Sequence, residues 1–502
     1  MILLLALAIF LLLDLAYNQD TMHATVYSRT TKITVLCIGL LVGVGGSYFM
    51  APSNMLIATL IVAGIISLFI KTKLASIIII GLVLGLARGA AFSKQLQPLH
   101  DIIGKNVTIT ARVDTPSSYN DKKALEFDVT HVKLQQPYAA DLPIKMQISG
   151  YGANTILRGD TISATGKIYK KRGSKQAGIS FAQLQVIQHD NSALQYVRRS
   201  FLAGMTTAMP EPHSQFAIGL LIGQKSGLPD YVVQTLQIVG LSHIIAVSGY
   251  NLTILADVSK RQLGKGSKLR GTLLSGSLVI LFVAMVGSSA SIQRAAFVSI
   301  LAIMAAHYGR SIKPMLLISL AAAVTTILNP LSVWSDVGWY LSFLAFFGVL
   351  VIAPIVQKRL YGVKEPSLLI KLCIETCSAQ IMTLPIMLLL FSQLSVVSLV
   401  ANILVVPLVP LAMLASFVAG LVGMVAPFVA PIVGLPAVWL LTYMLDISSL
   451  LSRIPHANVQ TSMSLPITLA VYASIVALLL VMQRTVRGKI KVTNRDNYVG
   501  TQ

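Results

Sequence analysis

The sequence predicts a polytopic α-helical membrane protein of about 12 spans with a small all-β domain inserted between its helices. Two observations support this prediction. Of the 502 residues, 55% are hydrophobic and only 11% are charged, and the mean hydropathy is +0.75, a composition typical of multi-spanning membrane proteins. Apolar runs long enough to cross a bilayer as helices recur along the chain, except over residues 100–192.

The predicted spans follow from the apolar runs. They lie near 33–50, 55–70, 74–92, 240–256, 272–289, 291–309, 314–333, 337–356, 366–390, 394–424, 428–452 and 463–482. The run at 394–424 is long for one span, and Pro407 and Pro410 are expected to interrupt it because proline disrupts an interior helix. Residues 1–17 lack the features of a signal peptide, so they form either a further span or an extension ahead of a true start at Met22.

The formal net charge of +21 partly reflects membrane topology, because Lys and Arg concentrate on the cytoplasmic side of spans. With the spans above, the basic residues within 260–270, 310–313 and 358–364 fall on the same side as the basic tail, residues 483–502. Residues 93–239 fall on the other side. We therefore expect a protein of the cytoplasmic membrane with a cytoplasmic C-terminus and an extracytoplasmic β domain.

That domain is expected over residues 93–194, after the N-terminal helices of residues 1–92. Polar and apolar residues alternate at 107–113, 125–129, 144–148, 161–168 and 182–187, with turn-rich links between them. Such alternation is typical of half-buried strands. Five strands in this length suit an OB-like barrel, a fold that often binds single-stranded nucleic acid.

The same region is basic, since residues 101–200 contain 14 Lys and Arg against 8 Asp and Glu. A nucleic-acid groove would use such charge against phosphates and aromatic rings for stacking on bases. The candidate phosphate ligands are Lys167, Lys170, Lys171 and Arg172, and the candidate stacking residues are Phe127, Tyr138, Tyr151 and Tyr169. A basic solvated face with aromatic residues in the core is the competing interpretation.

Residues 195–239 show helical spacing of apolar residues and a mixed character. They are expected either to lie along the outer membrane surface as an amphipathic segment or to pack on the outer domain. Residues 240–482 then form the main membrane domain.

Polar side chains within apolar runs mark the candidate functional site, because such groups are costly at membrane depth and usually face a cavity, a pathway or a partner. They are Ser242, His243, Ser248, Gly249, Asn251, Gln293, Arg294, Asp336, Trp339, Gln380 and Asn402. Together with prolines in several spans, they suggest broken helices that line a polar path. Taken singly, Arg294 is also explained by snorkelling to the interface, and Trp339 by an interfacial aromatic belt.

Several enzymatic motifs are missing from the sequence, including H-E-x-x-H, C-x-x-C and the P-loop. We therefore expect neither an enzyme nor a cofactor, and any driving energy or nuclease would come from other proteins. An intramembrane hydrolase built on His243 and Ser248 is the least favoured alternative, because five residues on a helix leave these side chains about 140° apart. The three cysteines are interpreted as apolar packing.

Six sequence blocks, in their order and spacing, resemble the ComEC family, the inner-membrane DNA channel of natural transformation. The central block 240–249 is close to the family pattern G-L-x-H-L-L-A-x-S-G. Two further blocks resemble single family patterns: residues 220–228 resemble L-x-x-G-x-x-S-x-L, and residues 291–296 resemble S-x-x-R-A. The remaining three blocks each combine two short matches. These are N-P-L with W-Y-L-S-F in 329–344, A-Q with L-P in 379–385, and L-V-A-N with V-P in 399–407. The resemblance covers roughly residues 30–482.

The resemblance implies a channel that imports single-stranded DNA, with a separate DNA receptor, nuclease and cytoplasmic motor as partners and with homo-oligomerisation left open. Two departures matter. Tyr250 and Asn251 replace the family's usual Leu-His, and the family's C-terminal metallo-β-lactamase-like domain has no counterpart here. A transporter of another solute on the same scaffold remains the main alternative.

Overall fold

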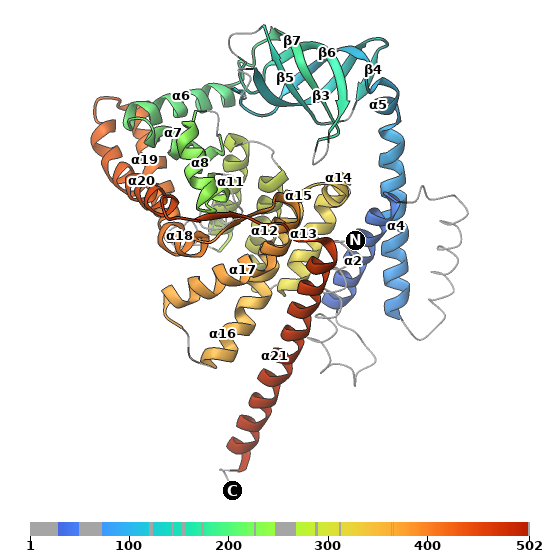
Figure 1. The fold of residues 1–502 in the computed structure, drawn as a ribbon, viewed down its shortest axis with the longest axis vertical. Helices are drawn as coiled ribbons and strands as arrows, with labels where there is room; N and C mark the ends of the chain where they lie inside the picture. The colour runs from blue at the N-terminus through green and yellow to red at the C-terminus, as the bar shows by residue number, and fades with distance from the viewer. Residues whose placement is uncertain are drawn as a thin grey trace.

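The computed structural model describes residues 29–49, 73–119, 124–142, 144–152, 156–171, 175–224, 227–245, 268–286, 290–310, 313–362, 364 and 366–499. The predicted spans at 1–17 and 55–70, and the candidate residues Ser248, Gly249, Asn251 and Arg172, lie outside these residues. The chain is mostly helical, and a small β domain follows its first helices (Figure 1).

Seven helical segments of the described residues are long and apolar enough to cross a membrane. They are α2 (Arg29–Ser47), α4 (Lys73–Gln95), α15 (Val337–Phe347) with η2 (Gly348–Ile352) and α16 (Ala353–Tyr361), α17 (Leu368–Phe391), α18 (Ser398–Val405) with η3 (Val406–Leu408) and α19 (Val409–Val425), α20 (Ala430–Ser452), and α21 (Leu465–Val499). Shorter apolar stretches lie in α7 (His213–Ile222), α11 (Lys268–Val286), α12 (Ala290–His307) and α13 (Pro314–Leu328). The count of about twelve spans therefore stays a prediction.

Two features of the helices have clear causes in the sequence. The predicted break within 394–424 is a short 3-10 turn at Val406–Leu408, centred on Pro407. Helix α13 ends at Leu328 instead of continuing to residue 333, because Asn329 and Pro330 follow it and start the short α14 (Leu331–Trp334).

Helices α2 and α4 pack closely because glycines face one another across the pair. A Cβ atom added to Gly43 would lie 2.2 Å from the carbonyl oxygen of Leu82, and one added to Gly85 would lie 2.2 Å from that of Leu40. Such small-residue contacts let helix backbones approach closely in membranes. Helix α4 then leads through the short α5 (Gln97–Ile102) into the β domain (Figure 1).

The β domain is a closed five-stranded barrel with two short additions. Its strands are β1 (Asn106–Val113), β2 (Ser118–Tyr119), β3 (Leu125–Gln136), β4 (Ala140–Leu142), β5 (Met146–Tyr151), β6 (Thr161–Lys170) and β7 (Ala177–Gln188). The ring runs β1-β6-β7-β5-β3 and closes by pairing of β3 with β1, while β2 and β4 pair with β3. Strands β5 and β7 are parallel, and the other pairs in the barrel are antiparallel.

Alternate residues of each strand point inward and form the barrel core. Ile109, Val129, Met146, Ile162 and Ile179 are fully buried there. The five long strands lie where the alternating runs of the sequence predict strands.

Beyond the barrel, α6 (Ala193–Ala208), α7, α8 (Asp230–Ile238) and α9 (Ser242–Ile245) pack with α18, α19 and α20 around the largest apolar cluster of the described chain. Gly204 of α6 lies against the backbone of α19, because a Cβ added to Gly423 of α19 would lie 2.1 Å from the Gly204 carbonyl oxygen. The buried face of α6 thus packs mainly on helices rather than on the barrel, whereas Arg199 of α6 contacts Asp160 and Asp190 at the barrel end.

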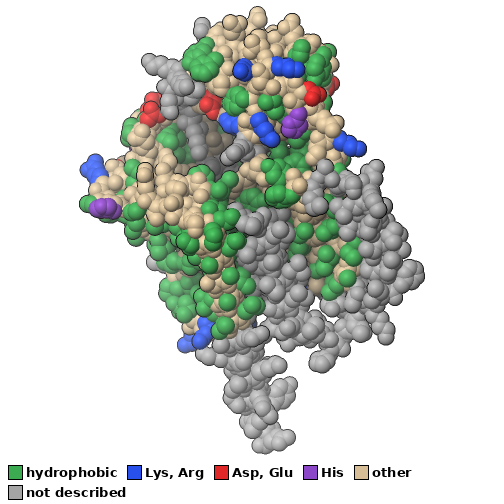
Figure 2. All heavy atoms as spheres, turned by 45° about the vertical axis from the view of Figure 1, so that its right-hand side comes forward, with side chains coloured by type: hydrophobic (Ala, Val, Ile, Leu, Met, Phe, Trp, Pro, Cys, Tyr) green, Lys and Arg blue, Asp and Glu red, His purple; other side chains and the backbone are tan. Residues whose placement is uncertain are grey.

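The barrel lies at one end of the molecule, and α21 runs to the other end (Figure 1). Lys358 and Arg359, in the last turn of α16, also lie on a helix that points away from the barrel. On the face shown in Figure 2, Lys and Arg side chains lie on the barrel and at the ends of the helical part, and the described helical surface between them is largely hydrophobic. A short antiparallel two-stranded sheet of β8 (Gln393–Ser395) and β9 (Asn458–Gln460) joins the end of α17 to the segment before α21.

Candidate functional site

Gln380 and the turn at Gly240 meet at Ser398, although they lie far apart in the sequence. The Gln380 Nε2 donates a hydrogen bond to the Ser398 Oγ at 2.5 Å, which joins α17 to α18. Gly240 has a φ of 75°, and a Cβ added there would lie 2.6 Å from the Ser398 Cβ. The His243 Nδ1 is 3.2 Å from the Gly240 carbonyl oxygen. The structure therefore brings three predicted polar segments into one cluster.

Polar groups of this cluster retain hydrogen-bonding capacity. The Asn402 Oδ1 and the Ser395 Oγ are buried and have no hydrogen-bond partner in the described part of the chain. Asn402 follows Ser398 by four residues on α18, so both side chains lie on the same helix face. Buried polar groups usually have partners, and unsatisfied ones at one place point to a ligand or water that the site receives. Ser242 and His243 are exposed at the start of α9.

The helices around this cluster are irregular. The π-helical turn η2 approaches α17 so closely that a Cβ added to Gly348 would lie 2.5 Å from the Ser378 carbonyl oxygen, two residues before Gln380. Pro385 lies inside α17 and removes one of its backbone hydrogen bonds. Single π-turns inside helices occur frequently at functional sites. We refer to Gly240, His243, Gln380, Ser395, Ser398 and Asn402 as the polar cluster.

Arg294 of α12 forms a second polar centre, where its side chain packs against the start of α15. Its side chain is 3% exposed, its Nη2 donates to the Gly338 carbonyl oxygen at 3.2 Å, and its guanidinium lies over the Phe343 ring at 6.0 Å. Its Nε has no hydrogen-bond partner among the described residues. Arg294 is therefore buried between helices, and the explanation by snorkelling to the interface is wrong for this side chain.

Asp336 and Trp339 organise the same region. The Asp336 Oδ1 accepts a hydrogen bond from the Trp339 backbone N–H at 3.3 Å and caps α15, and the charge of Asp336 also acts on Arg294. The Trp339 Nε1 donates to the Thr325 Oγ1 at 3.0 Å, and this indole is only 4% exposed. Trp339 is thus a buried residue, not part of an interfacial belt. Gln293, next to Arg294, is exposed on α12.

Both polar centres contact the continuous helix formed by α15 and η2. Gly338, whose carbonyl accepts from Arg294, and Gly348, which packs against Ser378 and Ala379 just before Gln380, are ten residues apart on this helix, or about 15 Å. Polar groups at two depths of an apolar bundle can replace water around a polar solute that passes between the helices.

The basic candidates of the barrel differ in accessibility. Lys167 and Lys170 are exposed on β6. Lys171 is half-buried, and burial, followed by the charge of Lys175, lowers its pKa. Lys175 is itself paired with Asp128 at 2.5 Å. Lys167 and Lys170 are therefore the candidates best placed to contact phosphates.

The aromatic candidates also separate into core and surface. Phe127 is 2% exposed in the barrel core, so its proposed stacking role is wrong. Tyr138, Tyr151 and Tyr169 are exposed on the surface.

The residue that sequence reasoning missed is Phe181, which is 64% exposed in the middle of β7 with a φ of 56°. Near Phe181 on β7, Ser180 is paired with Lys167 of β6 and Gln183 is paired with Tyr151 of β5, so a basic and an aromatic residue stand on the two neighbouring strands. Gly166 makes this bulge feasible, because a Cβ there would lie 2.7 Å from the Ile179 side chain. A bulky residue with positive φ is uncommon and often marks a functional position.

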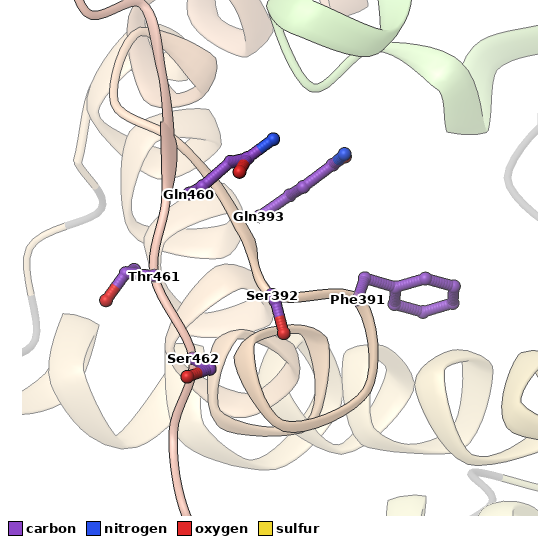
Figure 3. A pocket seen from close by; sticks show the side chains of 6 residues that line it. All are labelled: Phe391, Ser392, Gln393, Gln460, Thr461 and Ser462. Atoms are coloured by element: carbon purple, nitrogen blue, oxygen red, sulfur yellow. The ribbon is translucent and has the colours of Figure 1, made fainter.

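An open pocket of about 390 Å³ lies where the β8–β9 sheet meets the end of α17 (Figure 3). Its lining is Phe391, Ser392, Gln393, Gln460, Thr461 and Ser462, and the Gln393 and Gln460 side chains extend to the same side. None of the residues singled out from the sequence lines this pocket.

Comparisons with known proteins cover the helical part. A family model described as "Competence protein" matches residues 220–486, which is more than half of the chain. ComE operon protein 3 of Bacillus subtilis (strain 168) is 25% identical over 226 residues, which is 45% of this chain and 28% of that relative. The match thus spans less than a third of the relative's length. No solved structure matches. The range 220–486 includes the polar cluster and Arg294 but not the barrel.

Proposed function

Because the chain belongs to the competence protein family, we propose that it forms a channel through which single-stranded DNA crosses the cytoplasmic membrane into the cell. The observation that carries the proposal is the polar cluster, in which the buried Ser398 and the half-buried Gln380 and Asn402 lie among apolar helices beside a π-turn and Pro385. A phosphate chain cannot enter hydrocarbon, so its path needs polar groups that replace water. Arg294, about 15 Å away along α15, would supply positive charge on the same path.

The barrel would receive the strand first. Its strand order and its parallel β5–β7 pair support an OB-like barrel, a five-stranded architecture that binds oligonucleotides. Lys167 and Lys170 would contact phosphates, and Phe181 with Tyr151 and Tyr169 would stack on bases, because every base offers a π-face to an exposed aromatic ring.

The charges and the shape support one orientation. If the barrel lies outside, the cytoplasmic side would contain Lys358, Arg359 and the basic end of α21. This orientation agrees with the preference of Lys and Arg for the cytoplasmic side. The strand would then leave among basic residues. Because the sequence contains no P-loop, the driving energy would come from a separate motor, with a separate receptor and nuclease delivering the strand.

Planar-bilayer recording on the full chain tests the proposal. Single-stranded DNA added on the barrel side should cause transient current blocks whose duration grows with strand length, and blunt duplex should not. Gln380→Glu should make these blocks rarer because it places a negative charge on the path, and Gln380→Leu should remove a polar contact. Gln357→Leu in α16 is the matched control, since this half-buried glutamine lies outside the polar cluster.

The alternatives predict different recordings. A transporter of another solute would pass that solute with no effect of strand length, and the chain would bind no single-stranded DNA. The hydrolase alternative depends on Ser248, and it requires that an active-site probe label the wild type and not Ser248→Ala.

A further inference from the structure

The small sheet of β8 and β9 carries polar side chains along one of its faces. In this antiparallel pair Gln393 is paired with Gln460, and Ser395 is paired with Asn458. Directly paired residues lie on the same face of a sheet, and so do alternate residues of one strand. All four side chains therefore share one face, which we call the amide face, and the apolar residue between them in each strand lies on the other face.

The local sequence places this sheet at the end of α17. Ser392 follows the helix in the left-handed conformation, with a φ of 53°, which is a common way for a helix to end. The Ser392 carbonyl oxygen then accepts a hydrogen bond from the Thr461 backbone N–H at 3.1 Å, so the segments after α17 and before α21 are held together. Because α21 runs away from the barrel, the sheet lies at the end of α21 that is nearer the barrel (Figure 1).

The amide face connects the open pocket to the polar cluster. Gln393 and Gln460 line the pocket and extend to the same side (Figure 3). Ser395, two residues after Gln393, lies at the other end of the face. A Cβ added to Gly240 would lie 3.4 Å from the Ser395 Oγ and 2.6 Å from the Ser398 Cβ. The face therefore begins at the pocket and ends in the polar cluster.

Groups of the amide face retain hydrogen-bonding capacity. The Ser395 Oγ and the Asn458 Oδ1 are buried and have no hydrogen-bond partner within the part of the chain that the structure describes. Gln460 is exposed and Gln393 is half-buried, so their amides are accessible from the pocket. Both orphan atoms are oxygens that accept hydrogen bonds. Buried polar groups usually have partners, so this face suits a ligand that donates hydrogen bonds.

The chemistry of the pocket favours the edge of a nucleobase. A phosphate offers only acceptors, which do not match the amide oxygens, and the described residues that line the pocket are all uncharged. The edge of a base carries donors and acceptors side by side, and Asn and Gln side chains pair with such edges. Phe391 lines the same pocket and is 51% exposed, so its ring is available to stack on a base.

We propose that the amide face binds the Watson–Crick edges of unpaired bases where the strand enters the polar cluster. This inference rests on the proposed function and adds a basis for its preference for single strands. In a duplex the same edges are engaged with the opposite strand, so the amides have nothing to bind. Gln393 and Gln460 would make the first contacts, and Ser395 and Asn458 would meet the base as it advances.

The test uses the full chain in detergent and single-stranded oligo(dT) that carries one 4-thiothymidine, a photo-crosslinker on the Watson–Crick edge. In the wild type, peptide mass spectrometry should locate a crosslink within residues 391–395 or 458–462. Unlabelled oligo(dT) should compete for this crosslink. An oligomer of N3-methylthymidine keeps the phosphates and the ring faces but loses the N–H donor of the edge, so it should compete about tenfold less well.

Variants separate the chemistry of the face from the shape of the sheet. Gln460→Leu and Asn458→Leu should each lower the crosslink yield about fivefold or more. Asn458→Leu should not lower the Tm, because no described group loses a partner of the Oδ1 atom. Val459→Ala changes the opposite face of β9, and Gln357→Leu changes α16; both should crosslink like the wild type. Equal losses with Val459→Ala and Gln460→Leu would overturn the inference.

Further outcomes distinguish this inference from its neighbours. If N3-methylated and unmodified oligomers compete equally, base edges are not bound and the inference is wrong. If phosphatidylglycerol nanodiscs abolish the crosslink seen in detergent, lipid headgroups occupy the face and the inference also fails. If strands cross a bilayer while no crosslink reaches the sheet, only this inference is overturned. If the crosslink forms on the sheet but no strand crosses, the channel proposal fails while the base site stands.

Discussion

Phe181 offers the sharpest separation between stability and strand binding. Its ring is 64% exposed, so truncation removes little packing, whereas its φ of 56° imposes a strain of about 1–2 kcal/mol on a residue with a Cβ. Phe181→Gly relieves that strain and Phe181→Ala does not. The glycine variant should therefore be more stable than the alanine variant by about 1 kcal/mol.

Binding should respond differently, because both variants lose the ring. Stacking of one base on an aromatic side chain contributes about 1–3 kcal/mol, so both should bind single-stranded DNA about 5- to 150-fold more weakly. The salt slope should not change, because the ring carries no charge, whereas Lys167→Ala should reduce the slope by about one. Fluorescence anisotropy on the full chain in detergent, across a salt series, measures both quantities.

The controls are Phe181→Trp, which keeps a stacking face, and Trp439→Ala, which removes a ring that is 70% exposed on α20, a helix that packs on other helices. Both should bind like the wild type. Equal affinity of the wild type and both truncated variants would refute the stacking role of Phe181.

Three further predictions concern the architecture. Thr325→Val should lower stability by about 1–3 kcal/mol because it leaves the buried Trp339 indole N–H without its acceptor, and Thr325→Ser should restore it in a thermal melt. Gly85→Ala should cost about 1–3 kcal/mol and loosen α2 from α4, because its Cβ would lie 2.2 Å from the Leu40 carbonyl oxygen; crosslinking between the two helices would reveal the change, and unaltered crosslinking would contradict it. The Ser192 backbone N–H, more than any other group, lowers the pKa of Asp190 in the folded protein. The ionised Asp190 carboxylate therefore stabilises the fold fully above the ordinary carboxyl pKa of about 3.9, and this stabilisation is lost as pH falls through the lower folded pKa. Asp190→Asn should therefore flatten the acid side of the stability profile, and an unchanged profile would exclude this contribution.

Local patterns in the sequence predicted much of the fold. Alternation placed the five long barrel strands, and apolar runs placed α17, α20 and the start of α21. Pro407 correctly marked the break before α19. These features depend on neighbouring residues, so a single sequence is sufficient to find them.

The candidate site could be predicted only as a set of residue types. The contact of Gln380 with Ser398 and the packing of Ser398 on Gly240 join segments far apart in sequence, and no periodicity encodes such contacts. The bulge at Phe181 depends on glycines of the neighbouring strands. Arg198 is a further example, because a charged residue on a mixed helix suggests a solvated face, yet tertiary packing buries it.

The central claim is that a single strand of DNA crosses the bilayer through this chain. The most direct measurement is recovery of strand from the far side of a planar bilayer, by amplification, after nuclease treatment of the barrel side. The account predicts intact single strand on the far side with the wild type, much less with Gln380→Glu, and none with duplex or without protein. Current blocks with no recoverable strand, or equal recovery with Gln380→Glu, would contradict it.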